Sequence, residues 1–442
     1  MTLLKFPAGS AGPASAAEAV PRAPQSIEDT GLPQTFLVEL VAKAMFQRGL
    51  TKLVELSQTL ALSGSVIETV CAGMRRDAIL EVKSRGQTEA DQQYELTAAG
   101  RARAGDWLAR NQYVGPAPVP LEAYIQRVHA QSATGLRVTV EQVRAAFADL
   151  VVPPDLQDQL GIAVNSGRPM LLYGPAGSGK TFLAERMQRL LTGAIAVPHA
   201  IMVHGEIIRV FDEHWHKPLE GAELPKAGLD SRNRPDARWS LCRRPCVMAG
   251  GELTLEMLDL SFDARAGYYE APPHFKANNG LFIVDDLGRQ VLSPRALMNR
   301  WIVPMERGED YLMLRSGGKF AVPFNMVLAF CSNLGPAELE DSAFLRRMGQ
   351  KVYVGPMDLG DYRKVFDAVC ISRGLVGLDA GFKDLLALHA AEGRPYMACY
   401  PRDLLNLAGS RATFLGVEPQ SGGDQLQWAW RVYFGNTVDA TP

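Results

Sequence analysis

The stretch that decides the fold reads Leu171-Leu172-Tyr173-Gly174-Pro175-Ala176-Gly177-Ser178-Gly179-Lys180-Thr181. It contains the pattern G-x-x-x-x-G-K-[ST] of the phosphate-binding loop, or Walker A motif. The apolar run from Met170 to Tyr173 predicts a buried strand before the loop, and apolar residues at helical spacing predict a helix after it. Because the motif requires this strand–loop–helix context, a glycine-rich turn that matches by chance is the weaker interpretation.

Each residue type in this loop has a chemical role. Glycines let backbone N–H groups converge on the α- and β-phosphates of a nucleotide, and the start of the following helix adds partial positive charge. We expect Lys180 to reach the β- and γ-phosphates of ATP, and the Thr181 hydroxyl to hold Mg²⁺. The predicted nucleotide-binding residues are Gly174, Pro175, Ala176, Gly177, Ser178, Gly179, Lys180 and Thr181.

A second nucleotide motif follows in the run Leu281-Phe282-Ile283-Val284-Asp285-Asp286. A buried strand that ends in two acids has the pattern of a Walker B motif. Asp285 is expected to hold Mg²⁺, usually through water, and Asp286 to orient or deprotonate the attacking water. A strand ending in an acidic turn is the alternative, and the presence of the loop at 174–181 disfavours it.

Three further polar positions lie downstream. The predicted strand from Met326 to Cys331 leads into Asn333, where a polar side chain suits a sensor of the γ-phosphate. Arg346 and Arg347 precede another predicted strand, and such a pair is either a solvated helix end or a finger that reaches a neighbour's ATP. Arg402 follows Pro401 at the start of a helix in the C-terminal region, so it is a candidate for contacting the γ-phosphate from a lid.

In this order, these motifs resemble the AAA+ ATPase superfamily over about residues 140–435. The resemblance implies that Asn333 is sensor 1, that Arg346 and Arg347 are arginine fingers acting in trans, and that Arg402 is sensor 2. The run from Asp341 to Arg347 is close to the D-x-A-L-x-R-R pattern of several AAA+ unfoldases. The candidate catalytic residues are Asp286, Asn333, Arg346, Arg347 and Arg402, and the candidate metal ligands are Thr181 and Asp285.

A hairpin predicted before the sensor strand narrows the resemblance. The sequence runs from Met305-Glu306-Arg307-Gly308 through a Gly317-Gly318 turn to Pro323-Phe324. This resembles the pre-sensor-1 hairpin of the MoxR-like branch. The resemblance implies a homo-oligomeric ring, most simply a hexamer, that remodels a protein partner.

Two features depart from the AAA+ pattern. The family mostly has Asp-Glu at Walker B, whereas this chain has Asp285-Asp286, so we expect slower hydrolysis rather than none. Lys180 and Asp285 are also 105 residues apart, which leaves room for an insertion at about 195–275. Its part 212–272 has no assigned role, although Tyr268 and Tyr269 are either pore-loop aromatics that grip a threaded chain or packing residues.

The N-terminal third predicts a flexible Ala/Pro/Gly/Ser-rich tail at 1–31 and a winged-helix-like domain at 32–111, with three helices, a two-stranded wing and a closing helix. Between Gln34 and Ala104 there are nine Lys/Arg and eight Asp/Glu, a net charge of +1. The basic residues cluster near the wing. The outward positions at the start of the third helix lack the Arg, Asn or Gln that read bases; they are Ser63, Gly64, Ser65, Glu68 and Thr69. This favours protein docking over DNA binding.

The predicted fold is therefore α/β. It has a P-loop AAA+ core, a parallel sheet flanked by helices, together with an all-α C-terminal lid and an N-terminal winged-helix-like domain. The domain boundaries complete this prediction: a Pro-rich linker at 112–138, the ATPase core at 139–355 and the lid at 356–442.

Composition limits the classes of protein. The chain has 442 residues and a net charge of -2, which disfavours a protein that coats polyanions. Its six cysteines form no disulfide framework, and Cys242/Cys246 and His214/His216 lack convincing further metal ligands. No apolar run reaches the roughly 18 residues of a membrane span, and the first residues are too short for a signal-peptide core. We expect a cytoplasmic protein.

Taken together, the sequence predicts an ATP- and Mg²⁺-dependent AAA+ ATPase that remodels or assembles a protein partner as an oligomeric ring. Two alternatives remain open. One is a DNA-associated regulator that uses the winged helix, with the ATPase as an assembly switch. The other is a nucleotide-binding scaffold with little turnover, for which the short side chain of Asp286 is the reason.

Overall fold

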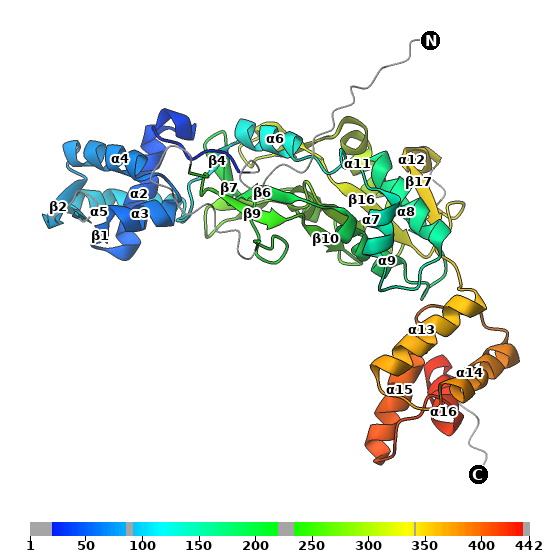
Figure 1. Ribbon diagram of the computed structural model, residues 1–442. Helices are drawn as coiled ribbons and strands as arrows, with labels where there is room; N and C mark the ends of the chain where they lie inside the picture. The colour runs from blue at the N-terminus through cyan, green and yellow to red at the C-terminus, as the bar shows by residue number, and fades with distance from the viewer. Residues whose placement is uncertain (1–19, 85–91, 220–233, 340–341, 436–442) are drawn as a thin grey trace, which may run out of the picture. The chain divides into compact units, whose positions relative to one another are not determined.

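The computed structural model describes residues 20–84, 92–219, 234–339 and 342–435 (Figure 1). By compactness the chain divides into two units, each assembled from separate stretches. Unit 1 comprises Met1–Gly135, Leu191–Phe282 and Ala296–Val327, and unit 2 comprises Leu136–Leu190, Ile283–Arg295 and Leu328–Pro442. Much of the predicted core at 139–355 thus groups with the N-terminal residues.

The N-terminal part of unit 1 has the predicted order of helices and strands. Its elements are α2 (Gln34–Arg48), β1 (Thr51–Lys52), α3 (Leu53–Leu60), α4 (Gly64–Arg76), β2 (Leu80–Ser84), β3 (Gln93–Leu96) and α5 (Ala98–Arg110). The strands form an antiparallel sheet in the order β1-β3-β2, of which β1 was not predicted. Apolar residues at helical spacing explain the packing, because Val66, Ile67 and Val70 on α4 are fully buried.

The rest of unit 1 is rich in strands. Its elements are β4 (Val119–Pro120), α6 (Leu121–Ala130), β6 (Ala194–Pro198), β7 (Ala200–Val203), β8 (Glu206–Arg209), β9 (Trp239–Arg243), β10 (Cys246–Ala249), η5 (Glu256–Leu258), β11 (Ser261–Asp263), β12 (Tyr268–Glu270), α10 (Pro273–Lys276), β14 (Glu309–Met313) and β15 (Lys319–Pro323). One sheet has the order β11-β12-β8-β7-β4, while β6 pairs with β9 and β14 pairs with β15. The β14–β15 pair is the hairpin predicted before the sensor strand.

The segment predicted as a linker at 112–138 is part of this folded unit. Val119 and Pro120 pair in parallel with Ile201 and Met202 of β7, and Tyr124 and Val128 on α6 are buried in the same core. The proline-rich composition suggested a free spacer. An edge strand, however, accepts proline because its outer side needs no ladder hydrogen bond.

The predicted tail at 1–31 also differs from the structure where it is described. Val20 is buried, Ala23 N donates to Arg234 O, and a short 3₁₀ helix, η1, spans Glu28–Thr30. Residues 1–19 of the predicted tail lie outside the described part of the chain. Residues 20–31 are therefore folded into unit 1, where Ala23 N donates to Arg234 O and Asp236 N donates to Pro21 O.

Unit 2 carries the motifs. Its elements are α7 (Val140–Ala146), α8 (Pro154–Ser166), β5 (Met170–Tyr173), α9 (Lys180–Arg186), η3 (Met187–Leu190), β16 (Val327–Ser332), α12 (Ser342–Arg347) and β17 (Gln350–Tyr353); β13 (Leu281–Val284) and α11 (Pro294–Arg307) also contribute residues. The five-stranded sheet has the order β10-β13-β16-β5-β17, and β5 pairs in parallel with both β16 and β17. The predicted α/β fold class is confirmed.

A helical region follows the sheet, as predicted for residues 356–442 within their described part. It consists of α13 (Leu359–Ser372), α14 (Leu378–Glu392), α15 (Tyr400–Leu415) and α16 (Gly423–Phe434). Its apolar residues form their own core, with Tyr362, Phe366 and Trp430 among the fully buried side chains. Across the described residues, no helix is both long and apolar enough to cross a membrane.

Candidate functional site

The phosphate-binding loop connects β5 to α9, as the motif requires. Gly174 has φ +144°, and a Cβ there would lie 2.2 Å from the Val354 carbonyl oxygen. Gly177 has φ +81°, and its Cβ would lie 2.6 Å from Cys399 Sγ. Any side chain at these two positions would therefore meet both a strained backbone and an occupied space, which explains the glycines.

Lys180 lies at the start of α9 with its ammonium group inside the loop. Its Nζ donates to the carbonyl oxygens of Gly174 and Pro175, both at 2.9 Å, and to Oδ1 of Asn333 at 2.8 Å. Burial lowers the pKa of Lys180, while the carboxylates of Asp285 and Asp286 oppose this shift. The ammonium is thus partly desolvated and held by neutral acceptors, which an anionic phosphate would outcompete.

The second relationship joins the two sequence motifs. The Thr181 hydroxyl donates to Oδ1 of Asp285 at 2.8 Å, although 104 residues separate them. Asp285 follows β13, and its backbone oxygen accepts a hydrogen bond from Gln290 Nε2 at 2.9 Å. A hydroxyl and a carboxylate oxygen side by side are hard oxygen donors of the type that Mg²⁺ prefers.

Asp286 and Asn333 form the third contact. Asn333 Nδ2 donates to Oδ1 of Asp286 at 3.1 Å, so Asn333 bridges Lys180 and Asp286 through its two amide atoms. Asp286 is exposed and has φ +52°. Aspartate tolerates this left-handed conformation better than most residues, which gives a structural reason for a short acid at this position.

The loop also contains an unsatisfied buried group. The Ser178 side-chain oxygen is buried and has no hydrogen-bond partner among the described residues. A buried hydroxyl without a partner is costly unless a ligand supplies one, and phosphate oxygens would do so. The residues present therefore fit a nucleotide phosphate.

A magnesium ion fits the same place only together with a nucleotide. Within the described part of the chain, no group of three or more His, Cys, Asp or Glu side chains is suited to a metal ion. Mg²⁺ is typically held by one or two protein oxygens together with phosphate oxygens and water. Thr181 and Asp285 can supply that protein share.

Two of the predicted arginines, Arg346 and Arg402, make no hydrogen bond or ion pair with the loop residues described above. Arg346, on α12, is exposed and has no hydrogen bond or ion pair with a described residue, whereas Arg347 is half-buried. Arg402, on α15, is 64% exposed in its side chain, and its Nε donates to Asp403 Oδ1 at 3.0 Å. An exposed arginine on α12 is what a finger directed at another subunit requires, but this role remains a prediction.

Sequence reasoning missed one lid residue that contacts the loop. The backbone N–H of Cys399 donates to the Gly177 carbonyl at 3.2 Å, and burial raises the pKa of the Cys399 thiol. The lid therefore touches the phosphate-binding loop two residues before Pro401. The sequence signal for it was only its position next to the start of that helix.

Other candidate residues pack within unit 1. Tyr269 is 2% exposed, and its hydroxyl accepts from Arg315 N at 3.0 Å. Tyr269 is therefore a packing residue rather than a pore-loop residue. Tyr268 is half-buried and lies edge-on against Tyr113. His216 Nδ1 accepts from Asp212 N, and Nε2 donates to the Lys276 carbonyl, so both ring nitrogens are used in packing contacts.

Two family models match parts of the chain. Residues 146–204, which contain β5, the phosphate-binding loop and α9, match "Magnesium chelatase, subunit ChlI". Residues 358–432, which contain the lid helices, match "Domain of unknown function (DUF8689)". The match at 358–432 lies within unit 2, whereas the match at 146–204 covers residues 146–190 of unit 2 and residues 191–204 of unit 1.

Comparison with individual proteins gives short or distant similarities. Vesicle-fusing ATPases from Dictyostelium discoideum and Arabidopsis thaliana are 44% and 46% identical over 50 residues, which are 11% of this chain and 6% of each relative. Among solved structures, NtrX from Brucella abortus in complex with ADP is 14% identical, with 65% of this chain and 55% of that chain covered and a TM-score of 0.40. The Thermotoga maritima RuvB Holliday junction branch migration motor is 12% identical, with 64% and 69% covered and a TM-score of 0.34.

The comparisons and the geometry of the structure coincide at the phosphate-binding loop. The chain spans only a small part of the curated relatives, so their activities as whole proteins do not transfer to it. The match at 146–204, by contrast, covers the loop whose Lys180 and Thr181 make the contacts described above. Residues 146–204 are similar to subunit ChlI of magnesium chelatase, and they contain the loop whose Lys180 and Thr181 are hydrogen-bonded to Asn333 and Asp285.

Proposed function

We propose that this chain binds ATP with Mg²⁺ at residues 174–181 and hydrolyses it as an oligomeric AAA+ ring that remodels or assembles a protein partner. The observation that carries this proposal is the convergence of Lys180, Thr181, Asp285, Asp286 and Asn333 through three side-chain hydrogen bonds. These are the residue types that bind phosphate, hold Mg²⁺ and position water in phosphoryl transfer.

In this mechanism the chain's own residues have separate tasks. Lys180 binds the β- and γ-phosphates in place of the carbonyl oxygens that it contacts here. Mg²⁺, when bound, neutralises charge on the phosphate oxygens. Asp286 accepts a proton from the attacking water or orients it, and the hydrogen bond from Asn333 holds the Asp286 carboxylate in position.

The proposed ring supplies a cation for the negative charge that develops during hydrolysis. Negative charge on the transferring γ-phosphoryl group is stabilised by a cation beyond the loop lysine. Arg346 is exposed and has no partner among the described residues, and Arg347 is next to it in the sequence. We infer that one or both reach the ATP of a neighbouring subunit, so that hydrolysis requires assembly. Arg402 contacts the γ-phosphate from the lid.

The experiment is ATP turnover per subunit measured against protein concentration with Mg²⁺ present. Specific activity is expected to rise steeply and then saturate as sites are completed between subunits. Flat, measurable activity, together with an unchanged monomeric mass by light scattering over the same range, would contradict the role of Arg346 and Arg347 in trans. Absence of turnover at all concentrations would contradict hydrolysis by the chain alone.

A second candidate is a nucleotide-binding scaffold with little turnover. The observation in its favour is Asp286, which is one methylene shorter than glutamate and has its carboxylate engaged by Asn333. A near-zero rate in both the wild-type protein and Asp286→Glu, with nucleotide binding intact, would favour it. The DNA-associated regulator has only the basic residues of the N-terminal domain in its favour.

A further inference from the structure

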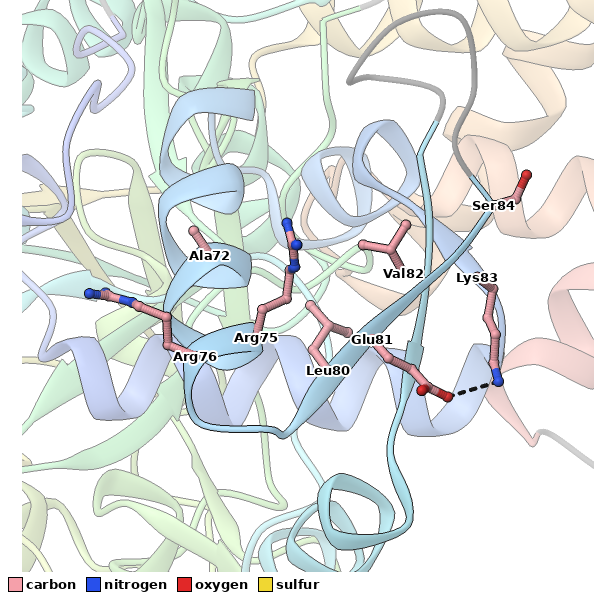
Figure 2. Close-up of a pocket in the computed structure, with 8 residues that line it drawn as sticks. All are labelled: Ala72, Arg75, Arg76, Leu80, Glu81, Val82, Lys83 and Ser84. Atoms are coloured by element: carbon pink, nitrogen blue, oxygen red, sulfur yellow. Dashed lines mark ion pairs between the residues drawn. The ribbon is translucent and has the colours of Figure 1, made fainter.

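An open pocket of about 880 Å³ lies in the N-terminal domain, between the end of α4 and strand β2. Figure 2 shows its lining: Ala72, Arg75 and Arg76 come from α4, and Glu81, Val82 and Lys83 come from β2. Arg75 extends along the side of the helix that faces the strand. This pocket is separate in sequence from all the nucleotide-site residues.

The charged groups at this pocket are not equivalent. Arg75 and Arg76 are exposed and have no hydrogen bond or ion pair with any described residue. Lys83, in contrast, pairs with Glu81 at 2.8 Å and with Glu95 at 3.6 Å. Cations near a helix C-terminus are stabilised by the helix dipole, which accounts for their presence but not for their position beside a pocket. The unsatisfied charge here is positive.

The strand beside the pocket is at an edge of its sheet. The order β1-β3-β2 leaves β2 with one neighbour, and its register pairs Leu80 with Leu96, Glu81 with Glu95 and Val82 with Tyr94. On the other side, no strand of the described chain pairs with it. An exposed edge offers main-chain hydrogen bonds to an added strand, and flanking side chains then select its sequence.

We propose that this pocket docks an acidic, extended segment of the protein partner, which adds as a strand along β2. Its carboxylates contact Arg75 and Arg76, and its apolar side chains pack on Ala72 and the half-buried Val82. The proposal rests on the proposed function in one respect, namely that the N-terminal domain recruits the partner to the ATPase.

The structure favours a peptide over DNA in two ways. A recognition helix contacts bases with its N-terminal residues, but the first turn of α4 is tied to another segment: Ser63 Oγ donates to Pro24 O and Ser65 Oγ donates to Gln25 O. Two unpaired arginines are few compared with the several phosphate contacts of a DNA-binding domain.

The test is fluorescence anisotropy on the full-length chain without nucleotide. The probe is a labelled hexapeptide of alternating glutamate and valine, compared with its lysine–valine counterpart and with a short duplex DNA. We expect the acidic peptide to bind most tightly. The double substitution Arg75→Glu/Arg76→Glu should weaken its binding about tenfold or more, whereas Arg103→Glu, an exposed arginine on α5 outside the pocket, should leave it unchanged.

A variant expected to gain affinity guards against misfolding as an explanation. Glu81→Gln removes the competing carboxylate and leaves Lys83 with only its longer contact to Glu95, so binding of the acidic peptide should strengthen roughly twofold. Two further peptides carry N-methyl groups on alternate amides, one at the odd-numbered and one at the even-numbered residues. At least one of the two should fail to bind, because strand addition needs the N–H groups that face β2.

Three results would overturn the proposal. They are unchanged peptide affinity in Arg75→Glu/Arg76→Glu, full binding of both N-methylated peptides, and tighter binding of duplex DNA that is lost in the same double variant. The last of these would support the DNA-associated regulator instead. Because binding is measured without ATP, a failure here leaves the ATPase assay unaffected, and a failed ATPase assay leaves this result standing.

Discussion

The hydroxyl of Thr181 donates a 2.8 Å hydrogen bond to Oδ1 of Asp285, which joins the first residues of α9 to the end of β13. The two residues are far apart in the sequence, and their contact creates a pair of oxygen donors next to the Lys180 ammonium. A hydroxyl, a carboxylate and an ammonium in this arrangement are the groups that the proposed binding of a phosphate–metal complex requires.

Loss of the loop lysine should abolish nucleotide-dependent activity. Lys180→Ala removes the cation that contacts Gly174, Pro175 and Asn333, so we expect turnover to fall about 10²- to 10³-fold. Binding of a fluorescent ATP analogue should weaken in parallel. Lys351→Ala, an exposed lysine on β17, is the matched control and should behave as wild type. Equal activity in both variants would exclude Lys180 from the site.

The residue after Asp285 should show a trade-off between rate and stability. Asp286→Glu brings a carboxylate closer to the attacking water, so we expect a severalfold higher kcat, whereas Asp286→Asn should lower kcat to near background. The φ of +52° at this position disfavours glutamate, so the Glu variant should lose about 1 kcal/mol of unfolding free energy. Steady-state kinetics and urea unfolding measure the two effects. An unchanged, measurable kcat in Asp286→Asn would rule out the proposed role.

Mixing two inactive variants should restore activity if the arginines act in trans. Arg346→Ala/Arg347→Ala keeps an intact loop but offers no finger, and Lys180→Ala has the opposite defect. In a randomly mixed ring, half of the loops are intact and half of their neighbours supply arginines, so roughly a quarter of wild-type turnover should return. Two variants that stay inactive on mixing, although light scattering shows mixed assemblies, would place the arginine function within one subunit.

A buried ion pair should be important for the stability of unit 1. Arg238 and Asp236 pair at 2.8 Å with side chains only 6% and 2% exposed, and Arg238 Nη1 also donates to Thr30 O and Pro118 O. Arg238→Met leaves the Asp236 charge buried without its partner, so unfolding free energy should fall by about 3–5 kcal/mol. Urea unfolding tests this, with the exposed Arg243→Met as the control. A cost no larger than that of the control would contradict it.

Unit 1 should also lose stability in mild acid through His216. Burial lowers its pKa from 6.5 to about 4, and the charge of Lys276 adds to the shift, while the hydrogen bond to the Lys276 carbonyl and the charge of Asp212 oppose it. The unfolded chain therefore takes up a proton below pH 6.5, which the folded chain resists until about pH 4. The contribution of His216 to the unfolding free energy is fully present above pH 6.5. It falls by roughly 3 kcal/mol as the pH drops to about 4.

The check on His216 is urea unfolding at several pH values across that window. His216→Gln should have a shallower dependence on pH, and His214→Gln, a change at an exposed neighbour, should keep the wild-type dependence. If both variants follow the wild-type curve, another group is responsible for the loss in acid.

Much of the site could be predicted because its residues belong to short local patterns. Lys180 and Thr181 lie at a fixed spacing from the loop glycines, and Asp285 follows an apolar run whose burial the sequence already indicates. The helix α13 (Leu359–Ser372) lies in the region predicted to be all-α, and its Asp358 cap, which accepts from Asp361 N, is a local feature of the same kind.

Other features could not be predicted because they depend on distant partners. Nothing near Thr30 in the sequence indicates that its carbonyl accepts from Arg238, and nothing in the proline-rich stretch at 114–120 shows that it ends in a strand beside β7. The cluster in which Asp310 Oδ2 contacts His274 Nε2 at 2.8 Å and Arg300 Nη2 at 2.9 Å joins α10, α11 and β14, and no local pattern indicates it.

By itself, then, the sequence determined the phosphate-binding loop, the acidic strand end and the polar sensor, since backbone geometry and side-chain chemistry at fixed spacing are local properties. Only the tertiary structure decided that Asn333 bridges Lys180 and Asp286, that Cys399 touches Gly177, and that β2 is an edge strand beside two unpaired arginines. Sheet order and lid contacts arise from packing between segments tens to hundreds of residues apart, and no local pattern encodes that packing.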